Sequence, residues 1–360
     1  NGEFKGEEIL SPEATEQMHR RQFAVMPEAG GLTMGFIEIF RNDKRLILHG
    51  GDTYLFHSGM FLIPDEKVGI FVSYNAPGGG QARMNLLNSF LDRYFPASTG
   101  TSAPGNSRTS SNGYSRSVGE FTGSYRSARS NLTTFEKVRN LFSPIEIKKA
   151  GESKLLMTGF GTGPAEWRRI GELTFENVSF RSNEKLFFSG DGEKGVKYLF
   201  MENNPTTVLI KLPWWGNYNL HLAIPVVVAL FFCISFLAWI LSAIYRRLYR
   251  VQSPKRSLDF RITRWVAGIT MISFLIFLLS FSLSAQSRAI IYGLTPSALI
   301  SLLFGMAGAF TSAVLVGLVI RSWIKGSGKL SHRLHWSAVV LSSLVFIWWM
   351  NYWNLLGIRV

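Results

Sequence analysis

A histidine followed by two glycines and an aspartate ends an apolar stretch near the beginning of the chain. Residues 45–49, RLILH, precede Gly50, Gly51 and Asp52. Histidine can donate a hydrogen bond and move a proton near neutral pH. Glycine has no side chain, so a substrate can approach the backbone closely at Gly51. The pattern His-x-Gly is weak by itself, because three loosely specified positions occur by chance in many chains.

The surrounding segments predict a sheet that would position this pattern. Apolar runs separated by short polar turns are typical of an antiparallel meander, and they lie at residues 32–40, 45–49, 58–64 and 68–74. Ser11 and Pro12 suit the start of a helix that ends near residue 22. Residues 81–95 place Leu87 and Leu91 at helical spacing, so we expect this second helix to pack on one face of the sheet.

In this context, residues 1–96 resemble the C-terminal part of the serine β-lactamase-like and penicillin-binding-protein-like hydrolases, an α+β fold. That family has three separated motifs: Ser-x-x-Lys with the nucleophile, Tyr-x-Asn or Ser-x-Asn, and Lys-Thr-Gly or His-x-Gly on a strand. His49-Gly50-Gly51 is similar to the third motif. The upstream Leu10-Ser11-Pro12-Glu13 and the terminal amphipathic helix are also similar to the family's order of elements.

The resemblance implies catalytic roles for His49, Gly50, Gly51 and Asp52. The motif would lie on an edge strand bordering the cleft, with His49 orienting the substrate and assisting proton transfer. The backbone N–H of Asp52 would be one of two oxyanion-hole donors, the other being the N–H of the nucleophile. The reaction would be hydrolysis or transfer at an amide or ester through an acyl-enzyme. His57 lies near the motif but is expected in the following loop, which makes it a weaker candidate.

The nucleophile motif has no suitable match in the chain. Ser182 and Lys185 fit Ser-x-x-Lys but fall between predicted strands, and Tyr352-Trp353-Asn354 fits Tyr-x-Asn at the end of an apolar helix. We therefore expect that the nucleophile lies upstream of Asn1 and that residues 1–360 alone are inactive. The alternative is a non-catalytic membrane-bound binding or sensor protein that retained the fold. The substrate remains open among β-lactams, D-amino-acid peptides, other peptides and esters.

Four apolar segments near the end of the chain predict transmembrane helices, and they lie at residues 222–245, 265–284, 297–320 and 334–355. Each is about 30 Å or longer as a helix, enough to cross the hydrocarbon core. Residues 213–360 contain thirteen Lys and Arg residues and one acidic residue, Asp259, and eleven of these cations lie in two loops. The positive-inside rule places both loops in the cytoplasm and the residues before 220 outside it. Membrane topology therefore explains the basicity, and we expect no nucleic-acid partner.

Composition divides the rest of the chain. Residues 97–117 are rich in Ser, Gly and Thr and predict a flexible linker. Residues 118–213 contain many short apolar runs, which predict a small β-barrel. The opening from Gly119 to Tyr125 resembles the lipocalin-like domain often appended to β-lactamase-related proteins. The predicted domains are thus the hydrolase part at 1–96, the linker, the barrel, and a membrane domain at 214–360.

The sequence indicates no metal or cofactor site. The six histidines have no ligand spacing with acids or cysteines, and Cys233 is the sole cysteine. The expected partners are therefore a small-molecule or peptide substrate and the lipid bilayer. The expected location is the cell membrane, with the soluble domains on the extracytoplasmic side.

Overall fold

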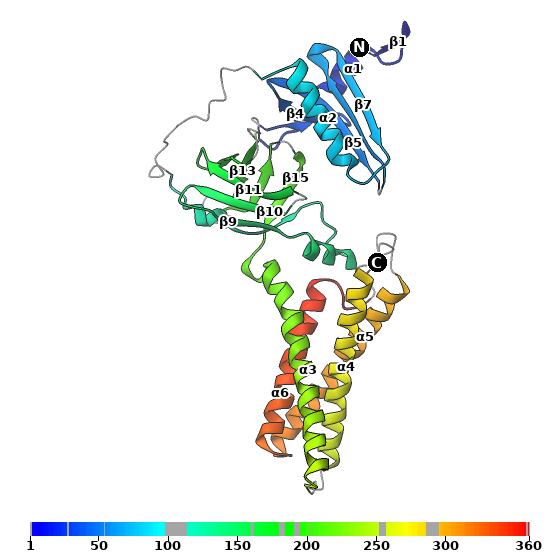
Figure 1. The fold of residues 1–360 in the computed structure, drawn as a ribbon, viewed down its shortest axis with the longest axis vertical. Helices are drawn as coiled ribbons and strands as arrows, with labels where there is room; N and C mark the ends of the chain where they lie inside the picture. Colours follow the sequence, from blue (N-terminus) through cyan, green and yellow to red (C-terminus); the bar gives the residue numbers. More distant parts are fainter. Residues whose placement is uncertain are drawn as a thin grey trace. The chain divides into compact units, whose positions relative to one another are not determined.

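A computed structural model describes residues 2–26, 29–53, 55–97, 114–159, 162–179, 184–190, 195–202, 204–251, 257–285, 295–357 and 359 (Figure 1). The chain forms two compact units. The first contains Asn1–Arg129 and Pro144–Leu212, and the second contains Ser130–Ser143 and Pro213–Val360. Most of the predicted linker, and Ser182 of the Ser-x-x-Lys match, lie outside the described residues.

The first unit contains a five-stranded antiparallel sheet in the order β3-β4-β5-β6-β7. Its strands are β3 (Gly31–Leu32), β4 (Ile37–Arg41), β5 (Lys44–Asp52), β6 (His57–Ile63) and β7 (Val68–Tyr74). The short strands β1 (Glu3–Phe4) and β2 (Glu7–Glu8) pair with each other. The predicted strand at 32–40 is interrupted, because Gly35 adopts a φ of 84° and the N–H of Thr33 donates to the carbonyl of Phe36. This turn separates β3 from β4.

Two helices accompany this sheet. Helix α1 (Pro12–His19) begins as expected, with the Ser11 side chain accepting from the N–H of Ala14. It ends before residue 22 because Arg20 is already extended. Helix α2 (Gly79–Tyr94) covers one face of the sheet (Figure 1). The buried core on this face consists of apolar side chains from three strands and α2: Ile39, Leu46, Phe61, Ile63, Leu87 and Leu91.

The first unit also contains a closed eight-stranded barrel, which confirms the predicted barrel. The strands are β8 (Gly123–Ser127), β9 (Ile145–Lys149), β10 (Lys154–Gly159), β11 (Thr162–Arg169), β12 (Thr174–Asn177), β13 (Lys185–Ser189), β14 (Tyr198–Met201) and β15 (Asn204–Lys211). Its core includes the fully buried rings of Phe121, Tyr125, Phe175 and Phe188. The Tyr125 hydroxyl donates to the carbonyl of Phe121 over 2.7 Å, and burial raises the pKa of this phenol. The core of this barrel is thus filled by its own side chains.

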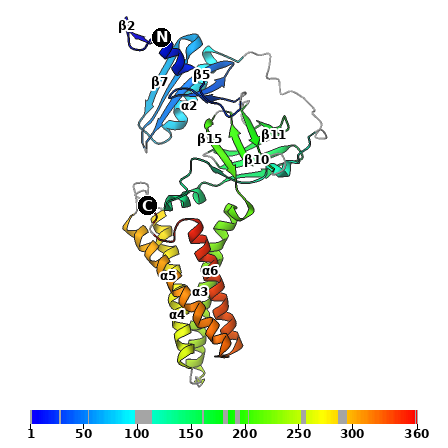
Figure 2. The same ribbon diagram turned by 180° about the vertical axis from the view of Figure 1, so that it is seen from behind.

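The second unit contains the helices α3 (Tyr218–Leu248), α4 (Leu258–Ala285), α5 (Pro296–Ile324) and α6 (Leu330–Tyr352). All four are long and apolar enough to cross a membrane, as the sequence predicts. Helix α4 packs along α5, and α3 lies beside α6 (Figure 2). Helix α3 starts before the apolar segment because the Asn217 side chain accepts from the N–H groups of Asn219 and Leu220.

Residues 130–143, which the sequence assigned to the barrel domain, cluster with these four helices. They include the 3₁₀ segment η4 (Phe135–Phe142). Asn354, just after α6, donates to the carbonyls of Leu132 and Thr134 over 2.8 and 2.9 Å. Lys137 donates to the carbonyl of Tyr352. These contacts hold residues 130–143 at the C-terminal end of α6.

Candidate functional site

The residues from His49 to Asp52 are the last four of β5. Strand β5 is the central strand of the sheet, so the expected edge position is wrong for the strand as a whole. The pairing of β5 with β4 nevertheless ends at Leu48, which is opposite Ile37. Beyond this point β5 pairs only with β6, as far as Asp52 opposite His57. The motif therefore lies at a local edge of the sheet.

The pairing with β6 also fixes the direction of the Asp52 backbone N–H. Next to the strand ends, the N–H of Thr53 donates to the carbonyl of Phe56 over 2.8 Å. Because hydrogen-bonded and non-hydrogen-bonded pairs alternate along an antiparallel ladder, Asp52 and His57 form a non-hydrogen-bonded pair. The N–H of Asp52 consequently points away from β6. It points to the side of β5 where β4 no longer pairs with it. A substrate oxygen on that side would meet this donor.

The His49 side chain lies on the face of the sheet opposite α2. Residues directly opposite on neighbouring strands share a face, so His49, Met60 and Phe71 lie together. His49 is exposed, and Phe71 is 71% exposed. The His49 ring makes no hydrogen bond to any residue that the structure describes. This end of the face is thus open, with an imidazole and a large apolar ring available for contact.

The Asp52 side chain points to the other face and binds residues of β6 and α2. His57 Nδ1 lies 2.6 Å from Asp52 Oδ1, and Arg83 Nη1 and Nη2 lie 3.0 and 2.8 Å from Oδ1 and Oδ2. Burial alone would raise the pKa of the Asp52 carboxyl, but the hydrogen bonds and charges of Arg83 and His57 outweigh it and lower this pKa. Asp52 is therefore a carboxylate held in a fixed orientation rather than an acid at neutral pH.

Arg83 also binds the backbone that contains the motif. Its Nη1 donates to the carbonyls of Ser58 and Gly51 over 2.7 and 3.2 Å. The Gly51 carbonyl and the Asp52 N–H belong to one peptide group, whose trans geometry makes them point in opposite directions. By binding the carbonyl, Arg83 fixes the plane of the peptide that presents the N–H. Arg83 is a positioning residue for this donor.

Gly50 explains how the guanidinium fits against the strand. A Cβ at Gly50 would lie 3.1 Å from Arg83 Nη2, closer than ordinary side-chain contacts. The absent side chain leaves room for Arg83. The middle residue of the pattern thus contributes to the arrangement through its size, without a functional group of its own.

The sequence reasoning missed part of this arrangement. It placed His57 in a loop, whereas His57 begins β6 and pairs with Asp52. It did not single out Arg83, which is only 15% exposed. A signal was present, because Arg83 precedes Leu87 by four residues and so places a cation on the helix face that packs on the sheet.

The described residues contain no group of three or more His, Cys, Asp or Glu side chains that could hold a metal ion. His49 and the Asp52, His57 and Arg83 side chains also lie on opposite faces of the sheet. The chemistry available at the open face is therefore hydrogen bonding and proton transfer by His49, together with donation by the backbone of Asp52.

No protein-family model and no curated protein matches this chain. Among solved structures, it is similar to SurE with D-Leu and to SurE, each at 12% identity and a TM-score of 0.34. It is also similar to an octameric penicillin-binding protein homologue from Pyrococcus abyssi, at 17% identity and a TM-score of 0.21. The matches cover 57% of this chain and 44%, 43% and 43% of those chains, so this chain spans less than half of their length. These likenesses are too weak to assign a family.

Proposed function

We propose that residues 1–96 form one wall of the active site of a serine hydrolase of the β-lactamase and penicillin-binding-protein type, which its apolar helices anchor in a membrane. The observation that supports this most is the orientation of the Gly51–Asp52 peptide. Its N–H points to the open side of β5, and Arg83 binds its carbonyl. A rigid backbone donor at an open strand end is what an oxyanion hole requires.

In the proposed reaction, the substrate carbonyl lies beside the end of β5. A serine from residues outside 1–360 attacks the carbonyl carbon, and the carbonyl oxygen becomes an oxyanion that accepts a hydrogen bond from Asp52 N–H. The C–O or C–N bond of the leaving group then breaks, and the leaving group takes a proton. Water hydrolyses the resulting acyl-enzyme and regenerates the serine.

His49 is the proposed proton carrier or substrate-orienting donor. It is exposed on the open face and has no hydrogen bond to a described residue, so its ring nitrogens remain available to a substrate. A histidine in place of the family's lysine favours an esterase or peptidase over an efficient β-lactamase. The proposed substrate class is therefore a peptide or ester outside the cytoplasm.

The test is phosphonylation of the nucleophilic serine in the full-length gene product by a fluorescent fluorophosphonate probe, which releases fluoride, with the protein held in detergent. We expect labelling of the wild type and a loss of about 100-fold or more in labelling rate for His49→Ala, because one general acid–base group contributes about 10²–10⁴-fold. His19→Ala is the matched control, since His19 belongs to the same unit but ends α1. Absence of labelling in a protein with an intact upstream Ser-x-x-Lys, or equal labelling of both variants, would refute the proposed function.

A further inference from the structure

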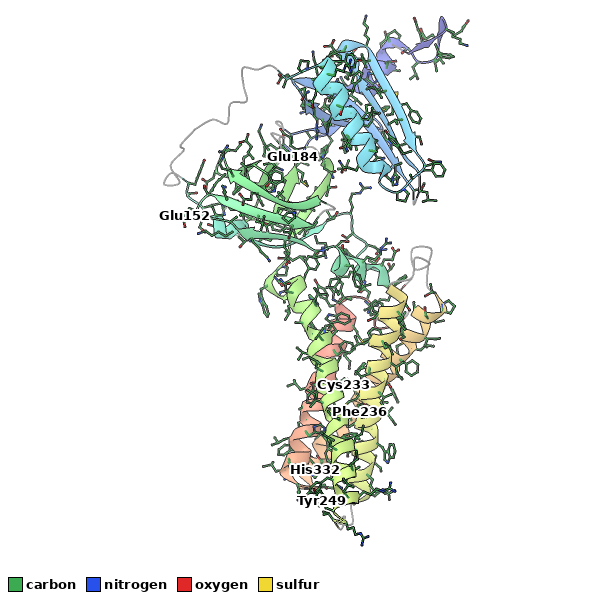
Figure 3. The ribbon with its side chains drawn as sticks, in the orientation of Figure 1. Glu152, Glu184, Cys233, Phe236, Tyr249 and His332 are labelled. Carbon is green, nitrogen blue, oxygen red and sulfur yellow. The ribbon has the colours of Figure 1, made fainter. Side chains whose placement is uncertain are left out.

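A cavity of about 240 Å³ lies within the helical unit, between α3, the start of α4 and the start of α6. Its titratable lining residues are Arg246, Arg264, His332 and His335, all of them half-buried, and the two arginines are cationic. Figure 3 places His332 at the same end of the bundle as Tyr249, which follows α3. This is the end that contains most of the basic residues of the unit. The cavity therefore combines a mainly apolar lining with two arginines, and it lies near the ends of membrane-spanning helices.

The two arginines of the cavity have neutral contacts. Arg246 Nη2 donates to Ser242 Oγ over 2.7 Å, and the Arg264 guanidinium lies 4.8 Å from the centre of the Trp239 ring. Neither arginine forms an ion pair with any carboxylate among the described residues. These contacts orient the two side chains but leave their charges uncompensated.

The helical unit cannot supply the missing counter-ion. Asp259 is the only acidic residue between positions 213 and 360. It pairs with Arg321 and Lys325 at 3.3 and 3.5 Å. The unit's other acidic residue, Glu136, pairs with Arg139 at 3.5 Å. Partly buried charges without a counter-ion are costly, so an anion from outside the protein would stabilise this cavity.

His335 also lines the cavity, but its Nε2 is not accessible from it. His335 Nε2 is buried and makes no hydrogen bond to a described residue. Two guanidinium groups therefore provide the charged N–H donors of the cavity. This donor set suits a phosphate, which arginine binds with paired hydrogen bonds.

We propose that this cavity binds the phosphate group of an anionic lipid headgroup or of a soluble phosphate ester. The volume is sufficient, because one water occupies about 30 Å³ of liquid and the cavity thus holds about eight. The position is suitable as well. A helix needs about 20 residues to cross the hydrocarbon core, and α3 has 31, so its last turns reach the headgroup region. The open cavity can then receive a headgroup from the bilayer.

The experiment uses the full chain in neutral detergent, titrated by calorimetry. The probes are dioctanoyl phosphatidylglycerol, dioctanoyl phosphatidylcholine and inorganic phosphate. The test variant is R246Q/R264Q, and the matched control is R247Q/R261Q, which removes the same charge from exposed positions on the same two helices. We expect the dissociation constant for phosphatidylglycerol to rise about tenfold or more in the test variant and less than about twofold in the control.

The arms of the titration distinguish the sources of the phosphate. Tight binding of phosphatidylglycerol alone identifies a lipid headgroup, and equal binding of inorganic phosphate identifies a soluble ligand; either result supports an anion site. Equal losses in R246Q/R264Q and the control would overturn it, because the effect would then be general surface charge. Binding of phosphatidylcholine as tight as that of phosphatidylglycerol would also overturn it.

A second variant keeps the arginines and guards against misfolding. Ser331 lines the cavity and is exposed, so S331E places a carboxylate of the protein itself beside the two arginines without removing a buried side chain. We expect S331E to raise the melting temperature of the ligand-free protein and to weaken phosphate binding about tenfold. Unchanged binding by a folded S331E protein would contradict the proposed site.

Discussion

Arg83→Gln is the substitution that most directly tests how the end of β5 is held. The Arg83 guanidinium forms a two-point ion pair with Asp52 and donates to the carbonyls of Ser58 and Gly51. The Asp52 side chain is 51% exposed, so solvent limits the ion pair to about 1 kcal/mol. The short hydrogen bond to Ser58 contributes about 1 kcal/mol more. The local loss is therefore about 2 kcal/mol.

Amide hydrogen exchange of the full chain, followed by mass spectrometry, measures this local loss. A decrease of about 2 kcal/mol in the free energy of local opening speeds exchange roughly 30-fold in peptides that cover Asp52 and Ser58. The control is Arg93→Gln, an exposed arginine in the last turn of the same helix whose guanidinium lies 5.7 Å from the Tyr94 ring centre. Unchanged exchange near Asp52 in Arg83→Gln, or an equal increase in the control, would refute the positioning role.

Three further predictions concern single side chains. The folded-state pKa of Asp52 is lowered, so the stabilisation that the carboxylate provides is present above the unfolded-state pKa of about 4 and is lost as pH falls through the folded-state pKa. The difference in melting temperature between the wild type and Asp52→Asn should therefore be constant from about pH 5 to 7 and should narrow below about pH 4. A Cβ at Gly79 would lie 2.7 Å from a β7 side chain, whereas one at Gly80 meets nothing closer than 3.7 Å; Gly79→Ala should therefore destabilise by about 1–3 kcal/mol in thermal unfolding and Gly80→Ala should not. In α5, a Cβ at Gly308 would lie 2.6 Å from an aromatic ring of α4 while Gly317 faces open space; Gly308→Val should lower the melting temperature in detergent, and an equal effect of Gly317→Val would show that α4 and α5 do not pack as described.

Local chemistry explains why much of the fold was predictable. The hairpin strands β6 and β7 agree with the predicted runs within one residue, because apolar residues and polar turns alternate clearly there. The four long helices were found from their apolar content, but each begins or ends beyond its apolar segment. Helical backbone hydrogen bonds continue beyond the apolar residues at the ends of a helix until a capping group stops them. At the start of α3 this group is the side chain of Asn217.

The candidate site was less predictable because its geometry depends on pairing between distant residues. The pattern from His49 to Asp52 was visible in the sequence, yet the direction of the Asp52 N–H follows from the register with β6. The contacts of Arg83 join residues 25 to 32 positions apart. The hydrogen bonds from Asn354 to Leu132 and Thr134 join residues more than 200 positions apart, and no local pattern indicates them. Such contacts are set by the packed structure as a whole.

The hydrogen bonds of Asn354 and Lys137 that attach residues 130–143 to the end of α6 have a consequence for proteolysis. The chain passes between the two units at three places: before Ser130, after Ser143 and before Pro213. A single cleavage next to Pro213 would leave the barrel still joined to residues 130–143, which the end of α6 retains through hydrogen bonds. Separation of the two units would therefore require cleavage at more than one of these crossings. One cut would thus leave a covalent or hydrogen-bonded link between the two units.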